Sequence, residues 1–338
     1  MIEASGLART FTTRRGTVEA VRGVDLSVAP GEIVGFLGPN GAGKTTTLRM
    51  LTTLLAPTAG TATVAGHDLR TDAVGVRRRI GYVAQGGGAG PAVPIGEELD
   101  LQARLYGVGD RAERIAKLCA RLELEGLLDR PAQALSGGQR RRLDIALGLV
   151  HRPPLVFLDE PTTGLDPHSR GNLWEHIRRM RDEDGTTVFL TTHYLDEADA
   201  LCDRILIIDH GRIVAEGTPD ELKRRVSGDV VILELADARP GGGPDADTAG
   251  ETGGGAAGET GGAARARAAL AGLPQVREAV VTGSSVRLTV DQGDRALPQV
   301  VRALDAAGVE MTALRMARPT LDDVFLTITG RSLREAAA

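Results

Sequence analysis

Residues 38–46 read Gly-Pro-Asn-Gly-Ala-Gly-Lys-Thr-Thr and follow directly on a short apolar run. They are Gly38, Pro39, Asn40, Gly41, Ala42, Gly43, Lys44, Thr45 and Thr46. The spacing fits G-x-x-x-x-G-K-[ST], in which glycines let backbone N–H groups close on phosphate oxygens. The lysine of this motif reaches the β- and γ-phosphates, and the threonine after it holds Mg²⁺. With 44 glycines but only three lysines in the chain, about 0.01 chance matches are expected.

The first 226 residues alternate short apolar runs with helical stretches, which is typical of an α/β domain. The apolar runs lie at 33–37, 155–158, 187–190 and 205–208. None of them alternates with polar residues, so we expect strands that are buried on both faces. The segment from 95 to 150 is rich in Leu, Ala, Arg and Glu at helical spacing. We therefore predict a helical subdomain inserted into the sheet domain.

The composition and pattern of the sequence change after residue 226. Strand-like and helical segments predict a small α+β domain over 227–338, and a final helix is expected at 320–327. From Gly241 to Gly262, 10 of 22 residues are glycine. Such a composition cannot bury enough surface to offset its ordering entropy. We therefore expect a disordered acidic insertion at about 237–263.

Two carboxylates, Asp159 and Glu160, end the apolar run that begins at Leu155. Acids at strand ends are common, so the pair by itself is more often structural than functional. Beside a phosphate loop, however, a functional role for this pair of carboxylates is favoured. Asp159 can then bind Mg²⁺ through water, and Glu160 can polarise an attacking water as a general base.

A second glycine turn precedes a predicted helix at 140–150, and its residues are Ser136, Gly137, Gly138 and Gln139. Such a turn is either a plain helix cap or a second anion site. One nucleotide does not need two phosphate cradles that lie far apart in the chain. The second cradle would make sense if it served a nucleotide bound to another copy of the chain.

Charge and cysteine content exclude several classes of function. The net charge is −5, without the excess of positive charge that binding to nucleic acid requires. The two cysteines, Cys119 and Cys202, form neither a disulfide framework nor a zinc site. The longest stretch free of charged residues, 50–67, contains five threonines and a proline. It should not span a bilayer, so any role at a membrane requires a partner.

With these motifs, the sequence resembles the ATP-binding cassette (ABC) ATPase family over about residues 1–226. The matching segments are Walker A at 38–46, the Q-loop residue Gln85, the signature at 135–139, Walker B at 155–160, the D-loop residue Asp166 and the switch residue His193. The resemblance implies a P-loop NTPase fold and a homodimer. In such a dimer, ATP with Mg²⁺ lies between Walker A of one copy and the signature of the other.

The same resemblance implies roles for further residues. Gln85 would contact Mg²⁺ and report to a transmembrane partner, and His193 would hydrogen-bond the γ-phosphate. Phe11 matches the aromatic residue that stacks on adenine, although a core phenylalanine is the competing interpretation. The glycine-rich stretch 86–91 departs from the family pattern, in a loop that normally touches the membrane partner. The departure bears on the coupling to that partner and not on the ATP chemistry.

The tail 318–326, Arg-Pro-Thr-Leu-Asp-Asp-Val-Phe-Leu, is similar to the C-terminal motif of daunorubicin/doxorubicin-resistance ATPase subunits. Its apolar residues could also simply pack the C-terminal domain. We expect an ATPase subunit of a drug or antibiotic exporter, peripheral on the cytoplasmic face of the membrane, with a separate permease. The alternatives are a transporter of another cargo, such as a lipid or polysaccharide, and a non-transport regulator acting on ribosomes or DNA.

The glycine-rich tract allows a first test. Because it is expected to be a tolerated surface insertion, deletion of residues 241–262 should leave the rate of ATP hydrolysis nearly unchanged. Steady-state phosphate release by the deleted and full-length chains measures this. A severalfold change in either direction would show that the tract regulates the enzyme.

Overall fold

The structure of the protein is a computed structural model that describes residues 1–14, 16–225, 229–235, 261–270, 272–282, 285–290, 293–317 and 319–329. The chain forms two compact units, one of Met1–Leu222 with Phe325–Ala338 and one of Lys223–Val324. Most of the insertion predicted at 237–263 lies outside the described residues, as does Arg318 of the tail motif. Residues 261–263, at its predicted end, belong to a helix.

A six-stranded sheet forms the centre of the first unit, in the order β10-β9-β3-β8-β7-β6. Its strands are β3 (Ile33–Leu37), β6 (Ile80–Val83), β7 (Leu155–Asp159), β8 (Thr187–Thr192), β9 (Arg204–Asp209) and β10 (Arg212–Gly217). All neighbours pair in parallel except β9 and β10, which are antiparallel. Every residue of β3, β7 and β8 is buried, as the unbroken apolar runs predict.

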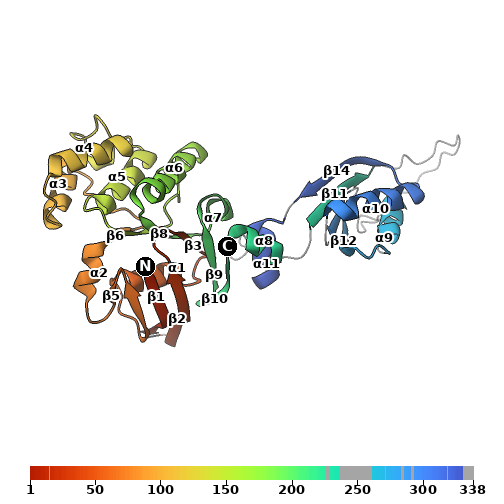
Figure 1. The fold of residues 1–338 in the computed structure, drawn as a ribbon, viewed down its shortest axis with the longest axis horizontal. Helices are drawn as coiled ribbons and strands as arrows, with labels where there is room; N and C mark the ends of the chain where they lie inside the picture. The colour runs from red at the N-terminus through yellow and green to blue at the C-terminus, as the bar shows by residue number, and fades with distance from the viewer. Residues whose placement is uncertain are drawn as a thin grey trace. The chain divides into compact units, whose positions relative to one another are not determined.

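Helices cover this sheet. The helical subdomain contributes α3 (Ile95–Leu105), α4 (Arg111–Arg121), a 3₁₀ turn (Ala132–Ala134) and α5 (Gly137–Leu149). The other helices of this part of the chain are α1 (Lys44–Leu51), α2 (Ala73–Arg79), α6 (Pro167–Asp184), α7 (Leu195–Leu201) and α8 (Pro219–Arg225). In Figure 1, α3 to α6 lie together on one side of β6, β8 and β3, and α1 lies on the other side with β1 and β2. The predicted α/β fold with a helical insertion is confirmed.

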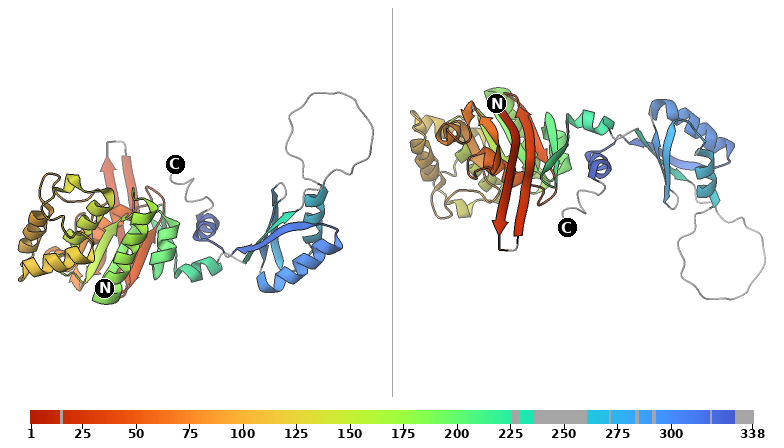
Figure 2. Two further views of the ribbon diagram at one scale, coloured as in Figure 1. Left: turned by 90° about the horizontal axis from the view of Figure 1, so that it is seen from above. Right: turned by 90° about the horizontal axis from the view of Figure 1, so that it is seen from below.

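A second, antiparallel sheet in the first unit was not expected from the sequence. It has the order β2-β1-β4-β5 and consists of β1 (Ile2–Thr13), β2 (Gly16–Val28), β4 (Ala59–Val64) and β5 (His67–Asp68). Three shifts of register interrupt the β1–β2 ladder, so apolar and polar residues do not alternate cleanly. The long hairpin of β1 and β2 extends beyond its neighbours in both views of Figure 2. Its buried side chains share one core with α1 and the central sheet.

The second unit is a four-stranded antiparallel sheet in the order β12-β13-β11-β14. In chain order its elements are β11 (Asp229–Leu235), α9 (Gly261–Leu270), β12 (Val276–Thr282), β13 (Ser285–Val290), α10 (Gly293–Ala306) and β14 (Met311–Ala317). This β-α-β-β-α-β order is that of the ferredoxin-like motif. Alternate residues of β11 and β13 share one buried cluster with side chains of α9 and α10, so both helices cover the same face. The last helix, α11, spans Leu321–Thr329.

No helix among the described residues is both long enough and apolar enough to cross a bilayer. Both cysteines, Cys119 and Cys202, are buried and unbonded to each other, in keeping with the interpretation of small core side chains.

The core of the second unit can be tested at Leu288, which is fully buried on β13. Leu288→Ala should lower the free energy of unfolding of this unit by about 2–5 kcal/mol, because it leaves a cavity. Urea unfolding of the full chain, followed by circular dichroism, measures the change. Val280→Ala, on the neighbouring strand with 47% of its side chain exposed, is the matched control and should change little. Equal effects of the two substitutions would contradict this account of the core.

Candidate functional site

Four neighbouring strands bring most of the predicted site residues to one edge of the central sheet. β3 leads into the glycine loop, β8 into His193, β7 into Glu160 and β6 into Gln85. These strands are adjacent in the sheet and parallel, so their carboxyl ends meet at the same edge. The crevice beyond the carboxyl ends of parallel strands is where such sheets bind ligands.

The glycine loop between β3 and α1 has a backbone that only glycine fits. Gly41 and Gly43 have φ angles of 78° and 108°, in the left-handed region. A Cβ atom on Gly43 would lie 2.6 Å from the Ala20 carbonyl oxygen, and one on Gly38 would lie 2.3 Å from that of Ile208. The loop is therefore wedged between β2 and β9. It ends at the N-terminus of α1, where free backbone N–H groups favour an anion.

Lys44 opens α1, and its side chain is only 4% exposed. Its ammonium donates hydrogen bonds to the carbonyl oxygens of Gly38, at 2.7 Å, and Pro39, at 3.1 Å. It also lies 3.4 Å from Glu160 Oε1. Burial lowers the pKa of Lys44, and the Glu160 carboxylate opposes that shift. The lysine is thus held at the centre of the loop, opposite a carboxylate.

Glu160 has an unusual backbone for a glutamate, with a φ angle of 45°. Such a conformation is strained and persists only where the surroundings hold it. Its N–H donates to Thr191 at both the carbonyl oxygen, at 3.2 Å, and the hydroxyl, at 3.0 Å. The side chain is 8% exposed and turns toward the glycine loop, where it meets Lys44.

The carboxylate of Glu160 collects several polar partners. Oε2 accepts hydrogen bonds from Gln85 Nε2 at 2.9 Å and Thr163 Oγ1 at 3.2 Å, and it lies 3.3 Å from His193 Nδ1. The contact with His193 lowers the pKa of Glu160 most, and Lys44 adds to it against the effect of burial, giving about 2. Glu160 is therefore ionised at neutral pH.

Thr45 and Asp159 lie together beside this carboxylate. Thr45 Oγ1 donates to Asp159 Oδ1 at 3.0 Å, and Thr191 Oγ1 donates to the same oxygen at 2.7 Å. Hydroxyl and carboxylate oxygens are the ligands that Mg²⁺ prefers. This pair of donors, with the Gln85 amide nearby, therefore fits the predicted magnesium site.

Three residues of this region were missed in the sequence. Thr191 supports both Asp159 and Glu160, and Thr163 binds the Glu160 carboxylate. Arg141 is buried and donates to the carbonyl oxygens of Asp159 and Pro161. The only sequence signal for Thr191 is a polar residue directly after the apolar run that ends at Leu190. Arg141 stands within a run of three arginines, a pattern that usually marks a solvated face.

The second glycine turn forms a helix cap. Ser136 is the N-cap of α5, and its hydroxyl accepts a hydrogen bond from the Gln139 N–H at 3.3 Å. The Gln139 side chain accepts one in return from the Ser136 N–H at 3.0 Å. Ser136 thus caps α5, and the binding of an anion by this turn stays a prediction. In the part of the chain that the structure describes, no hydrogen bond or ion pair links this turn to Lys44 or Glu160.

Asp166 lies next to the same turn. It caps α6 by accepting hydrogen bonds from the N–H of Ser169, at 3.0 Å, and its hydroxyl, at 2.7 Å. A Cβ atom on Gly138 would lie 3.0 Å from the Ser169 hydroxyl. The D-loop residue and the signature segment are therefore neighbours through Ser169.

Phe11 lies on β1, outside the central sheet, and its side chain is only partly buried. The Arg9 guanidinium carbon lies 4.6 Å from the centre of its ring. Phe11 does not belong to the cluster of buried core side chains, so the competing core interpretation is not supported. Its stacking on adenine stays a prediction.

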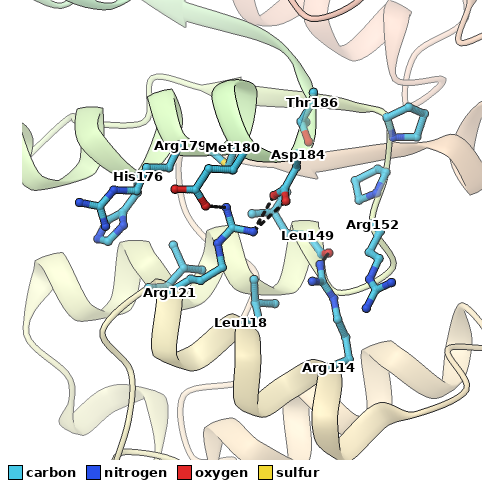
Figure 3. Close-up of a pocket in the computed structure, with 15 residues that line it drawn as sticks. Arg114, Leu118, Arg121, Leu149, Arg152, His176, Arg179, Met180, Asp184 and Thr186 are labelled. Carbon is cyan, nitrogen blue, oxygen red and sulfur yellow. Dashed lines mark hydrogen bonds and ion pairs between the residues drawn. The ribbon is translucent and has the colours of Figure 1, made fainter.

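A cavity of about 670 Å³ lies elsewhere, between α4, the C-terminal end of α6 and the segment before β7. Figure 3 shows Arg121 reaching across it toward Asp184. Arg121 pairs with Asp184 at 2.7 Å and with Glu183 at 3.1 Å, so one cation there meets two carboxylates. None of the predicted site residues lines the cavity. Its shape alone is therefore no guide to the chemistry at the sheet edge.

Comparisons with known proteins agree with this geometry. A family model described as "ABC transporter" matches residues 21–163, and one described as "ATP-binding protein DrrA1-3-like, C-terminal domain" matches residues 259–329. The chain is 43% identical to the daunorubicin resistance ATP-binding protein DrrA3 of Streptomyces coeruleorubidus, over 96% of each chain. It is also 43% identical to the daunorubicin/doxorubicin resistance ATP-binding protein DrrA of Streptomyces peucetius, over 99% of this chain and 96% of that one.

Some relatives and solved structures match a smaller part of the chain. The Nod factor export ATP-binding protein I of Cupriavidus metallidurans is 44% identical, but over only 60% of this chain and 67% of its own. Among solved structures, the dimeric post-hydrolysis state of the ATP-binding cassette MJ0796, bound to ADP and Pi, superposes with a TM-score of 0.61 at 27% identity. The match covers 64% of this chain and 98% of that one.

The buried lysine allows a test of the phosphate loop. Lys44→Ala should weaken ATP binding by about 10- to 100-fold, the loss of one hydrogen bond to a charged group. Titration with a fluorescent ATP analogue measures the affinity. Lys117→Ala is the matched control, since that side chain is 63% exposed and pairs with Glu113, one turn away on α4. Unchanged affinity in Lys44→Ala would refute the role of the loop.

Proposed function

The chain belongs to the ABC transporter ATP-binding family, in its DrrA-like branch, and from this premise we propose that it powers a drug or antibiotic exporter. It is an ATPase subunit, and the permease is a separate transmembrane protein. One observation carries the proposed ATP hydrolysis, and the similarity to the drug-resistance relatives carries the proposed cargo. Four adjacent strands place Lys44, His193, Glu160 and Gln85 at one sheet edge, with an ionised carboxylate among them.

Hydrolysis needs a base for the attacking water and positive charge near the phosphates. Glu160 is the proposed base: its ionised carboxylate takes a proton from water as the oxygen attacks the γ-phosphorus. The bond from that phosphorus to the β,γ-bridging oxygen breaks, which leaves ADP and phosphate. Lys44 donates to the phosphate oxygens, and His193 hydrogen-bonds the γ-phosphate from the end of β8. The proposed role of Gln85 is to align the water and Glu160, to which its amide already donates.

Thr45 and Asp159, with Gln85, would hold the Mg²⁺ that accompanies ATP, because their oxygens are adjacent. Bound there, the ion neutralises charge on the phosphates. Thr191 fixes the Asp159 carboxylate from the side of β8, so the oxygen donors are preorganised.

The proposed assembly is a homodimer in which each ATP lies between the glycine loop of one copy and the signature of the other. Ser136 is the N-cap of α5, and Gly137 and Gly138 are its first residues. A helix N-terminus is a suitable place for phosphate. The turn has no bond to the Lys44 cluster among the described residues, and a site completed by a second copy accounts for that separation.

The proposed permease contact is a groove of about 380 Å³ between the sheet edge and the helical subdomain. It is lined by the backbone of Gly87 and Gly88 and by the side chains of Leu54 and Tyr106. Leu54 is 57% exposed and Leu105, on α3 beside Tyr106, is 73% exposed. Contiguous exposed apolar surface marks interaction sites, and we assign these side chains beside the groove to such a surface. This surface would place the chain on the cytoplasmic face of the membrane.

Drug or antibiotic cargo is favoured over a lipid or polysaccharide by the extent of the similarity. The drug-resistance relatives match nearly the whole chain, including the C-terminal unit, whereas the Nod factor export protein matches 60% of it. The cassette is common to both groups, so only the C-terminal unit distinguishes them.

The role of Glu160 is open to direct test. Glu160→Gln should keep ATP affinity but lose turnover by at least about 100-fold, the scale of a general base. Phosphate release and binding of a fluorescent ATP analogue measure the two quantities. Glu175→Gln, a 52% exposed glutamate on α6, is the matched control. Near-normal turnover in Glu160→Gln would falsify the assignment.

Export is tested in inverted membrane vesicles that contain this chain and the membrane protein encoded beside it. ATP-dependent uptake of a fluorescent anthracycline, abolished by Glu160→Gln, is the expected result. Vigorous ATP hydrolysis without uptake would keep the ATPase and reject this drug class. Radiolabelled lipid would then be supplied from outside to the same vesicles, and its ATP-dependent transport would test the alternative cargo.

A further inference from the structure

Arg141 lies on α5, five residues after the signature serine, and is only 7% exposed. Its guanidinium makes three hydrogen bonds, all to backbone carbonyl oxygens. Nε donates to Pro161 at 2.8 Å, Nη2 to Asp159 at 3.0 Å and Nη1 to Ala84 at 2.6 Å. A buried charge needs such partners, because an unpaired guanidinium would be costly to desolvate.

The three carbonyl groups have a common feature. Asp159 and Pro161 stand immediately before and after Glu160, and Ala84 stands immediately before Gln85. One planar guanidinium thus holds the chain on both sides of the proposed base and at the start of the Q-loop. The backbone it holds at Glu160 is the strained one, with a φ angle of 45°. Strained backbone persists only where its surroundings over-determine it.

Asp144, one turn farther along α5, holds the other end of the Q-loop. It is 7% exposed, and its Oδ1 accepts a hydrogen bond from the Gly88 N–H at 3.1 Å. A Cβ atom on Gly87 would lie 2.8 Å from Asp144 Oδ2, and Gly87 has a φ angle of 76°. The glycine-rich stretch that departs from the family pattern is therefore the segment that must approach a buried carboxylate closely.

We infer that Arg141 is a positioning residue for hydrolysis, which fixes Glu160 and Gln85 relative to each other through their backbones. Asp144 completes the clamp, so that α5 holds the Q-loop both before and after Gln85. This inference rests on the proposed function of Glu160 and Gln85. Among the described residues, the hydrogen bonds of Arg141 go to backbone carbonyl oxygens and not to the side chain of Glu160 or Gln85.

The position of the clamp on α5 has a consequence for the proposed dimer. The same helix begins at Ser136, in the turn that would face the nucleotide of the second copy. An α-helix of 13 residues is a stiff connection. Closure of the signature on one nucleotide would therefore act, through Arg141 and Asp144, on the Glu160 and Gln85 of the other site.

The experiment compares Arg141→Gln, Arg141→Lys and wild type by kcat for ATP hydrolysis and by the Kd of a fluorescent ATP analogue. Arg141→Gln should lower kcat by about 100-fold, the effect of a misplacement near 1 Å, while Kd changes by less than about 3-fold. Lysine keeps the charge but not the planar fork, so Arg141→Lys should recover part of the loss.

Arg114→Gln is the matched control. Arg114 is also partly buried, and it donates to the carbonyl oxygens of Leu149 and Val150 at the other end of α5. Arg114→Gln should lower the melting temperature about as much as Arg141→Gln does, but its kcat should stay within about 3-fold of the wild-type value. A double variant, Arg141→Gln with Glu160→Gln, should lose no more turnover than Glu160→Gln alone, because both changes remove one function.

Three results would overturn the inference: a near-normal kcat in Arg141→Gln, an equal kcat loss in Arg114→Gln, or losses that multiply in the double variant. If Arg141→Gln does not fold, Arg141→Lys and Asp144→Asn are tested by the same criteria. Normal turnover in Glu160→Gln would instead reject the proposed base, and the inference with it. If Glu160→Gln loses turnover but Arg141→Gln does not, the inference is rejected and the proposed base is kept.

Discussion

The buried contact between Lys44 and Glu160 is the constraint on which the site depends. An ionised carboxylate that is 8% exposed would be costly to bury without a partner. Lys44 supplies the opposite charge, and Gln85, Thr163 and His193 supply polar contacts. The lowered pKa of Glu160 is the result of this surrounding. The groups that stabilise the charge are also those that the proposed hydrolysis uses.

The sheet makes this contact possible. Lys44 and Glu160 are far apart in the chain but follow β3 and β7, which are separated in the sheet by β8 alone. The intervening strand contributes Thr191 to hold the Glu160 backbone, and His193 follows at its end. The glycine loop can approach closely because it meets backbone atoms of β2 and β9 where a side chain would clash. The arrangement of these strands thus brings Lys44 and Glu160 together at one edge of the central sheet.

Around this edge, local sequence rules are broken in a consistent way. Glu160 adopts a backbone that glycine prefers, and Arg141 and Asp144 are charged residues inside the protein. Proteins tolerate such conflicts mainly at functional sites, where other interactions compensate. Here the conflicts compensate one another, because Arg141 binds the carbonyl groups beside Glu160 and Asp144 binds the loop after Gln85.

The sequence by itself determined the α/β fold, the buried strands, the helical insertion and the α+β arrangement of the second unit. It also determined the residue types of the site, because phosphate binding requires a glycine loop with a lysine, and such motifs are local in the chain. Only the tertiary structure decided that the β1–β2 hairpin packs on α1, because its irregular register hides the alternation. Likewise, only the fold decided that Thr191 and Arg141 support Glu160. Their partners are backbone atoms distant in the chain, and contacts to backbone leave no pattern in the sequence of side chains.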